Sequence, residues 1–104
     1  MINSKNPSIE WEVIYNPMGI FLVNKYDEIG DCIIKKNKYE LHLQEIYTKL
    51  IQPEFVCIDA GANLGYHSIQ FGKLCKKVYA FEPQPMIYNQ LCANILFNDL
   101  NQVI

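Results

Sequence analysis

The stretch Val56-Cys57-Ile58-Asp59-Ala60-Gly61-Ala62-Asn63-Leu64-Gly65 decides how this chain folds, together with Val78-Tyr79-Ala80-Phe81-Glu82-Pro83 downstream. The first predicts an apolar strand and a tight turn that opens a helix, and the second predicts another apolar strand that ends in an acid. Glycines let a turn backbone approach a ligand closely, and a carboxylate at the tip of the next strand can accept hydrogen bonds from ribose hydroxyls. This layout indicates a site for a nucleoside-bearing cofactor.

The segments around this stretch alternate between strand and helix. Phe55–Ile58 is apolar at every position, which predicts a strand covered on both faces of a parallel sheet. A helix is expected from about Tyr66 to Leu74, a second parallel strand over Lys77–Phe81, and the start of a third at Asn101–Ile104. Strands that alternate with helices in this way predict a right-handed βαβ unit.

The helix after the second strand is predicted from its prolines and its apolar spacing. Pro83 and Pro85 end the strand and open the helix, because proline in the first helical turn costs no hydrogen bond. The helix is expected to end near Asn98. Its expected apolar face is formed by Ile87, Leu91 and Ile95 and widened by Tyr88, Cys92 and Leu96.

The first half of the chain predicts a hairpin. Trp11–Tyr15 and Met18–Asn24 are β-prone runs, and the Asn16-Pro17-Met18-Gly19 segment between them suits a type I turn. Asp31–Lys35 predicts a third extended segment. Residues 1–8 are polar and are expected to form a frayed tail.

A helix is predicted between the hairpin and the first parallel strand. Apolar residues recur at helical spacing from Tyr39 to Ile51, and Pro53 ends the pattern.

The composition describes one small domain. The 104 residues are 50% hydrophobic and 12% aromatic, which is enough for a packed core. The net charge is −2, and all nine cationic side chains counted as Lys or Arg are Lys. Without guanidinium groups the chain lacks bidentate phosphate clamps, so no nucleic-acid partner is expected.

Cysteine spacing and hydropathy indicate the cellular compartment in which the protein is expected. The four Cys include no C-x-x-C pair, so neither a disulfide framework nor a zinc site is predicted. No apolar stretch has the length of a membrane span or a signal peptide. A cytoplasmic protein without a membrane partner is expected.

Asp59 and Glu82 are the two acids whose positions are hardest to explain by a purely structural role. Asp59 ends an otherwise apolar strand, where its carboxylate could hold the amides of the following turn or receive the amino group of a cofactor. A turn-forming Asp that caps the loop is the alternative. Asn63 lies between Gly61 and Gly65 and tolerates positive φ better than most residues that carry a Cβ. Glu82 at the next strand tip strengthens the cofactor interpretation over that of an exposed strand-end acid.

The string Asp59-Ala60-Gly61-Ala62-Asn63-Leu64-Gly65-Tyr66-His67, with Ala80-Phe81-Glu82-Pro83 downstream, resembles the S-adenosylmethionine site of FkbM-type methyltransferases. These are Rossmann-like enzymes that usually methylate hydroxyl oxygens of sugars and secondary metabolites. The resemblance covers about residues 18–104 and includes Tyr39-Glu40, where the family tends to carry a similar acid. It implies S-adenosylmethionine as the cofactor and a small-molecule hydroxyl as the acceptor.

The resemblance also implies which residues bind the cofactor. The turn residues would line the methionine end, Glu82 would bind the ribose diol, and Glu40 would lie near the methionine amino group. The implied set is Asp59, Gly61, Ala62, Asn63, Gly65, Tyr66, Glu82, Pro83 and Glu40. His67 is interpreted as a histidine beside the cofactor or in solvent and His42 as a surface histidine, so the catalytic base is unknown and no metal is implied.

The expected fold class is α/β: an incomplete Rossmann-like (class I methyltransferase) parallel sheet with helices, preceded by an N-terminal β-hairpin and helix. Residues 1–52 are expected to form the hairpin and helix, and residues 53–104 the cofactor-binding βαβ half of a single partial domain. The complete domain of the family has a larger sheet. The open sheet edge of this chain favours self-association or a complementing polypeptide.

Three functions are consistent with these features. The leading one is S-adenosylmethionine-dependent O-methylation of a sugar or small-molecule hydroxyl, with the short chain expected to be inactive alone. The alternative is a non-catalytic interaction protein or half of a split enzyme. An NAD-dependent oxidoreductase is the weaker alternative, because the turn lacks G-x-G-x-x-G and an Asp precedes its first glycine.

Overall fold

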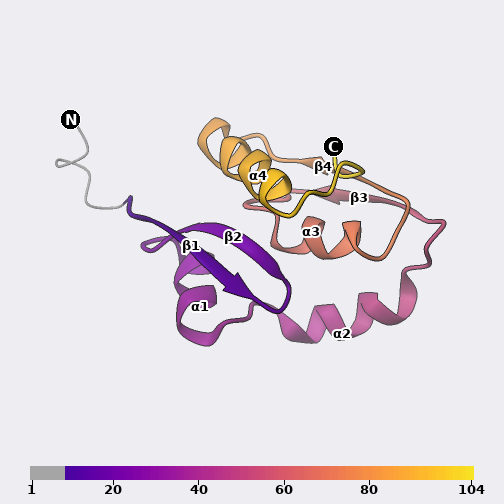
Figure 1. Cartoon of the computed structure of the whole chain (residues 1–104), viewed down its shortest axis with the longest axis horizontal. Helices are drawn as coiled ribbons and strands as arrows, with labels where there is room; N and C mark the ends of the chain where they lie inside the picture. Colours follow the sequence, from indigo (N-terminus) through magenta and orange to yellow (C-terminus); the bar gives the residue numbers. More distant parts are fainter. Residues whose placement is uncertain (1–8) are drawn as a thin grey trace.

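Over residues 9–104 the fold consists of a β-hairpin, a parallel strand pair and four helices (Figure 1). A computed structural model describes residues 9–104, and the tail predicted over residues 1–8 lies outside them. The elements are β1 (Trp11–Asn16), β2 (Gly19–Asn24), α1 (Glu28–Lys36), α2 (Leu41–Leu50), β3 (Val56–Ala60), α3 (Tyr66–Gly72), β4 (Lys77–Phe81) and α4 (Pro85–Phe97). In Figure 1 the hairpin and α1 lie to the left, the β3–β4 pair lies to the right, and α2 runs below.

The predicted hairpin is confirmed. β1 and β2 pair antiparallel, with Trp11 opposite Asn24 and Asn16 opposite Gly19. The amide of Met18 donates to Asn16 Oδ1 at 2.7 Å, and this side-chain contact supports the two-residue turn.

The segment predicted as extended over Asp31–Lys35 is helical instead, as part of α1. The Asp27 carboxylate accepts from the amides of Ile29 and Gly30, both at 3.1 Å, and so caps the first turn. Acids occupy the first turn and lysines the last, which suits the helix dipole. Capping and charge placement thus outweigh the strand preference of the two isoleucines in this segment.

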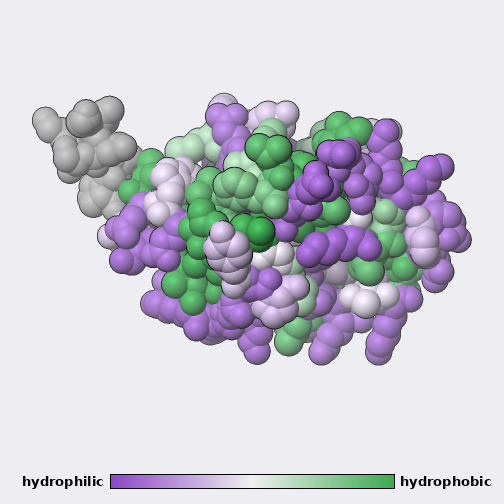
Figure 2. Space-filling model, in the orientation of Figure 1, coloured by the Kyte–Doolittle hydropathy of each residue, from purple (hydrophilic) through white to green (hydrophobic). Residues whose placement is uncertain are grey.

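The helix predicted from Tyr39 to Ile51 is present as α2, although it contains no buried residue. Its apolar side chains remain largely open, and Ile46 is 54% and Leu50 64% exposed. The hydrophilic lower rim of the molecule in Figure 2 lies over α2. Hydrophobic side chains gather over the hairpin in that view. In β1, Trp11, Val13 and Tyr15 are exposed.

The predicted parallel strands are confirmed. β3 pairs with β4 in parallel register from Val56 opposite Lys77 to Ala60 opposite Phe81, and α3 connects them. Val103 forms a parallel bridge with Val78 on the other edge of β4, as expected for the start of a third strand.

The sheet is covered on one face, whereas the sequence predicted β3 to be covered on both. Val78 and Ala80 point into a buried cluster shared with Leu91 of α4. The opposite face carries Val56 and Ile58, which are 56% and 70% exposed. The described residues place both crossover helices on the same side, which leaves this face bare.

The buried face of α4 is partly polar, which corrects the apolar widening predicted through Tyr88, Cys92 and Leu96. Those three side chains are exposed. Gln90, Asn94 and Asn98 face the hairpin instead and hydrogen-bond to the backbone of β2. The open edge of β2 offers unpaired peptide groups, and side-chain amides satisfy them as another strand would.

The two halves of the chain share a core. Phe21 and Val23 of β2 pack with Ile33 of α1 and with Leu64, Tyr66 and Ile69 around the start of α3. None of the helices within residues 9–104 combines the length and the apolar character required to cross a bilayer.

Candidate cofactor-binding site

The turn between β3 and α3 has the backbone conformation that its residues predict. Asn63 has φ 56°, and Gly61 and Gly65 have φ 77° and 98°. A Cβ at Gly61 would meet open space, whereas a Cβ at Gly65 would lie 2.6 Å from Leu91 Cδ1. Gly65 therefore permits close helix packing, and Gly61 leaves backbone accessible to a ligand.

The strand-tip acid Glu82 is hydrogen-bonded to this turn. Its Oε1 accepts from the amide of Asn63 at 2.8 Å, and its Oε2 accepts from the amide of Gln84 at 3.1 Å. The amides of Gly61 and Ala62 both donate to the carbonyl of Phe81 at 2.9 Å. The end of β4 thus holds the turn in place and keeps the Glu82 carboxylate beside it.

Asp59 is bonded to α3 rather than to the turn. Its Oδ2 accepts from the Ser68 hydroxyl at 2.6 Å. The prediction that Asp59 holds the turn amides is therefore wrong, because Phe81 and Glu82 already accept from Gly61, Ala62 and Asn63. Its other predicted role, contact with a cofactor amino group, stays a prediction.

A cavity of about 160 Å³ opens beside the turn. The predicted site residues that line it are Glu40, Asp59, Gly61, Ala62, Asn63 and Tyr66. Ile29, Tyr39, Leu64 and His67 complete its wall. Residues from α1, the α2 N-terminus and α3 thus converge on the turn, which sequence spacing alone does not show.

Three predicted site residues lie outside the cavity wall. Gly65 is the N-cap residue of α3, and Pro83 is exposed between β4 and α4. Glu82 is bonded to the turn from outside the cavity. The structure therefore separates a strand-tip acid from a cavity that contains two further acids.

Tyr66 belongs to both the core and the cavity wall. It is 4% exposed, and its ring centroid lies 4.8 Å from that of Phe21. Burial raises the pKa of Tyr66, so its phenol remains protonated at neutral pH. One aromatic residue can thus pack in the core and line the cavity at the same time.

Sequence reasoning missed a chain of hydrogen bonds at the cavity wall. Glu40 Oε1 lies 2.8 Å from His67 Nε2, and His67 Nδ1 lies 3.2 Å from the Tyr47 hydroxyl. Glu40 and Tyr47 are seven residues apart and therefore share a helical face, which was the available signal. Nothing in the sequence places His67 opposite that face.

The electrostatics of the cavity favour a cationic group. Glu40 and Asp59 bring two carboxylates to one small space, and no Lys side chain is among the lining residues. Desolvation and then the charge of Glu40 raise the pKa of Tyr39, so that phenol also remains a neutral donor. Ammonium and sulfonium groups fit such a site better than phosphates do.

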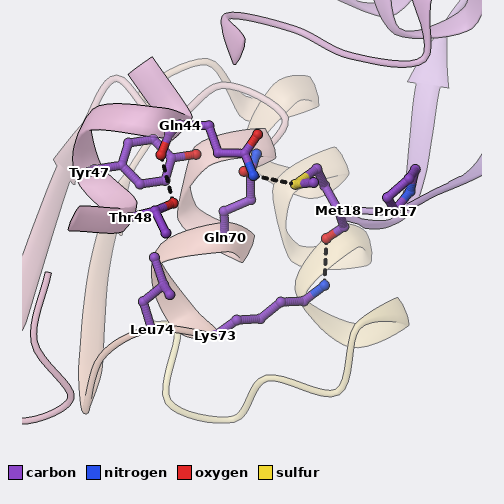
Figure 3. Close-up of a pocket in the computed structure, with 8 residues that line it drawn as sticks. All are labelled: Pro17, Met18, Gln44, Tyr47, Thr48, Gln70, Lys73 and Leu74. Atoms are coloured by element: carbon purple, nitrogen blue, oxygen red, sulfur yellow. Dashed lines mark hydrogen bonds between the residues drawn. The ribbon is translucent and has the colours of Figure 1, made fainter. Parts of the chain in front are cut away.

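A second cavity of about 170 Å³ lies between the hairpin turn, α2 and α3 (Figure 3). In that view Lys73 reaches from α3 to the carbonyl of Met18, and Gln44 Nε2 donates to Met18 Sδ at 3.0 Å. Burial lowers the pKa of Lys73. These contacts join the hairpin turn to α2 and α3 and lie outside the cofactor turn.

Within residues 9–104, no group of three or more His, Cys, Asp or Glu side chains could hold a metal ion. Cys32, Cys57, Cys75 and Cys92 are all free thiols.

No protein-family model matches the chain. A curated relative, tRNA(Phe) (4-demethylwyosine(37)-C(7)) aminocarboxypropyltransferase of Methanocaldococcus jannaschii, is 45% identical over 51 residues, which cover 47% of this chain and 20% of the relative. The chain therefore spans about a fifth of the length of that protein.

Solved structures share the fold over most of this chain. M. jannaschii TYW2 in complex with AdoMet matches with a TM-score of 0.69 and 26% identity, over 90% of this chain and 41% of that one. Trm5b from Pyrococcus abyssi matches with a TM-score of 0.72 and 20% identity, over 92% of this chain and 27% of that one. M. jannaschii Trm5 in complex with adenosine matches with a TM-score of 0.55 and 17% identity, over 99% of this chain and 49% of that one.

The fold and these matches define a class. The chain has the α/β fold of S-adenosylmethionine-dependent methyltransferases, and the comparisons support S-adenosylmethionine as the cofactor of that fold. Among the matched proteins, TYW2 was solved with AdoMet bound, and it shares 26% of its aligned residues with this chain.

Proposed function

We propose that this chain binds S-adenosylmethionine at the turn between β3 and α3 and serves as the cofactor-binding part of a methyltransferase. The hydrogen bond from the Asn63 amide to Glu82 Oε1 is the observation that carries the proposal. It keeps the strand-tip carboxylate beside the turn, where each oxygen retains a lone pair for one ribose hydroxyl. The accessible backbone at Gly61 leaves room for the ligand.

The size of the cavity supports a divided binding mode. Ligand pockets typically enclose about 300–1,000 Å³, whereas the cavity beside the turn encloses about 160 Å³. It therefore suits the amino-acid end of the cofactor, with the ribose outside it at Glu82. The carboxylates of Glu40 and Asp59 then face the positive charges of that end.

When bound, S-adenosylmethionine supplies an electrophilic methyl group on a sulfonium. The residues of this chain bind and orient it, which is most of what methyl transfer requires of a protein. The proposed acceptor is a hydroxyl of a sugar or small molecule, as the FkbM resemblance implies. His67 is not a free base for that hydroxyl, because its two ring nitrogens are already bonded to Glu40 and Tyr47.

The curated relative favours a second candidate. Its name states transfer of an aminocarboxypropyl group to tRNA(Phe), and its match covers 51 residues at 45% identity. An acceptor RNA would have to be recognised mainly elsewhere, because the chain carries a net charge of −2 and no Arg.

A labelling experiment with the label at two different positions of the cofactor separates these candidates. S-adenosylmethionine labelled on its methyl group or on its carboxyl group is incubated with the chain and with either hydroxyl acceptors or bulk tRNA. Methyl label on a hydroxyl acceptor supports the first candidate, and carboxyl label on tRNA supports the second. Calorimetry comes first: binding of NAD without binding of S-adenosylmethionine would refute both.

The bare sheet face favours a complementing polypeptide as the structural partner. Val56, Ile58 and Phe81 are 56%, 70% and 58% exposed on one face, and β3 has an unpaired edge among the described residues. Parallel sheets are normally covered on both faces. We therefore expect the isolated chain to bind cofactor weakly and to transfer no methyl group alone. In the labelling experiment, transfer is accordingly expected only when a polypeptide that covers this face is supplied with the chain.

A further inference from the structure

Glu40 has a backbone conformation that its side chain does not favour. It is the N-cap residue of α2 with φ 49° and ψ 48°, and its side chain makes no capping hydrogen bond. The left-handed region disfavours residues that carry a Cβ, and N-caps favour Ser, Thr, Asp or Asn. Strained residues of this kind persist where the surrounding contacts hold them, and they cluster at functional sites.

His67 provides the contact that holds the Glu40 side chain. Its Nε2 lies 2.8 Å from Glu40 Oε1, and the two side chains are 21% and 35% exposed. An ionised carboxylate only accepts hydrogen bonds, so His67 Nε2 carries the proton.

Tyr47 fixes the other side of the imidazole. Its hydroxyl lies 3.2 Å from His67 Nδ1. With a proton on Nε2 of the neutral ring, Nδ1 is an acceptor and the Tyr47 hydroxyl donates to it. Burial, followed by the negative charges nearby, raises the pKa of Tyr47, which keeps that donor protonated.

Aromatic rings restrict the rotation of this imidazole. The ring of Phe71 is stacked on it at 22° with centroids 6.3 Å apart, and the rings of Tyr39 and Tyr47 lie 5.8 and 5.7 Å away. The ring is therefore held by packing as well as by hydrogen bonds.

We propose that His67 and Tyr47 are positioning residues, which hold the Glu40 carboxylate where it receives the α-ammonium group of S-adenosylmethionine. This inference rests on the proposed cofactor function. Glu40 and His67 line the same cavity as Asp59, so the carboxylate that His67 orients shares this cavity with a second acid. Two carboxylates with separate hydrogen-bond partners suit the three donors of one ammonium group.

The test compares two ligands that differ only in the part that Glu40 would bind. S-adenosylhomocysteine carries the amino acid, whereas 5′-methylthioadenosine has the same adenosine and a thioether without it. Both are titrated into the full ¹⁵N-labelled chain and followed by NMR. We expect His67→Ala and Tyr47→Phe to weaken S-adenosylhomocysteine about tenfold and about threefold, as for lost charge-assisted and neutral hydrogen bonds, and to leave methylthioadenosine unchanged.

Matched variants control for general effects. His42→Ala and Tyr15→Phe change the same residue types at exposed positions outside the cavity, and neither is expected to alter the preference between the ligands. His67→Gln retains a donor near the position of Nε2 and is expected to restore most of the S-adenosylhomocysteine affinity.

A second measurement does not depend on ligand binding. Histidine ¹⁵N shifts report which nitrogen carries the proton. We expect the Nε2–H form of His67 in the wild type and a mixture of both forms in Glu40→Ala, which removes the acceptor for that proton.

The outcomes separate the inference from the function on which it rests. If neither ligand binds the wild type, the proposed cofactor function fails, and the inference fails with it. If both bind and the variants weaken both equally or neither, the positioning role is wrong and cofactor binding stands. An Nδ1–H form of His67 in the wild type would also contradict the positioning role.

Discussion

The side-chain amide of Asn94 pairs with the backbone of Leu22 as a neighbouring strand would. Asn94 Oδ1 accepts from the Leu22 amide at 2.6 Å, and its Nδ2 donates to the Leu22 carbonyl at 3.2 Å. Asn98 makes the same pair with Ile20, at 2.9 and 2.7 Å. Four residues of helix rise about 6 Å and two residues of strand about 6.6 Å, so the two pairs stay in register.

Replacement of Asn94 by Ala is expected to lower the free energy of unfolding by about 3 kcal/mol. The side chain is fully buried and also donates to the carbonyl of Leu64 at 2.8 Å, so its loss leaves several backbone groups without partners. Urea denaturation measures the change. Asn89→Ala at an exposed position of the same helix is the control, and an equal loss in both variants would contradict the role of the pair.

Glu82→Gln is expected to weaken S-adenosylmethionine about tenfold. The variant retains an oxygen for the Asn63 amide but loses the charge and the second acceptor, which together serve the ribose diol. Calorimetry with the full chain provides the measurement, with Glu45→Gln on the exposed surface of α2 as the control. Unchanged affinity in Glu82→Gln would remove the ribose contact from the proposal.

Asp27→Ala is expected to cost about 1 kcal/mol of stability, because it removes the acceptor for the first amides of α1. Asp27→Asn keeps an oxygen at the same place and should cost less. Thermal unfolding of both variants distinguishes them. If the two variants unfold alike, the charge rather than the cap stabilises this end.

Thiol chemistry should follow the pKa of Cys57. Burial, with the neighbouring Cys75, raises the pKa of Cys57 to about 11, so below that pH the group remains largely the unreactive thiol. We expect iodoacetamide at pH 8 to modify the exposed Cys92 first. The alkylation rate of Cys57 should keep rising towards pH 11. Mass spectrometry of digested samples measures both rates, and early modification of Cys57 at pH 8 would contradict its raised pKa.

The isolated chain is expected to self-associate as its concentration rises. Val56 and Ile58 form part of an exposed apolar sheet face beside an unpaired edge. The double variant Val56→Thr, Ile58→Thr keeps β-branched residues and should shift sedimentation towards the monomer. Val13→Thr on the exposed side of β1 is the matched control. A wild type that sediments as a monomer throughout would show that this face needs no cover.

The elements that the sequence determined are those with strong local signals. The apolar runs of β3 and β4, the glycines at positions 61 and 65 and the prolines that open α4 are all local, and each element lies where it was predicted. The closeness of Glu82 to the turn followed as well, because adjacent parallel strands end at the same sheet edge. The local signal was misleading at α1, where the Asp27 cap outweighed the strand preference of the residues predicted to be extended.

Only the tertiary structure decided which partners the polar groups have. Asp59 bonds to Ser68 and not to the turn, Glu40 meets His67 across two helices, and Asn94 serves the hairpin from the opposite end of the chain. Each of these contacts joins residues from different elements. Sequence spacing fixes the face on which a side chain lies, but hydrogen bonding depends on which face packs opposite it, and the packing of the whole chain settles that.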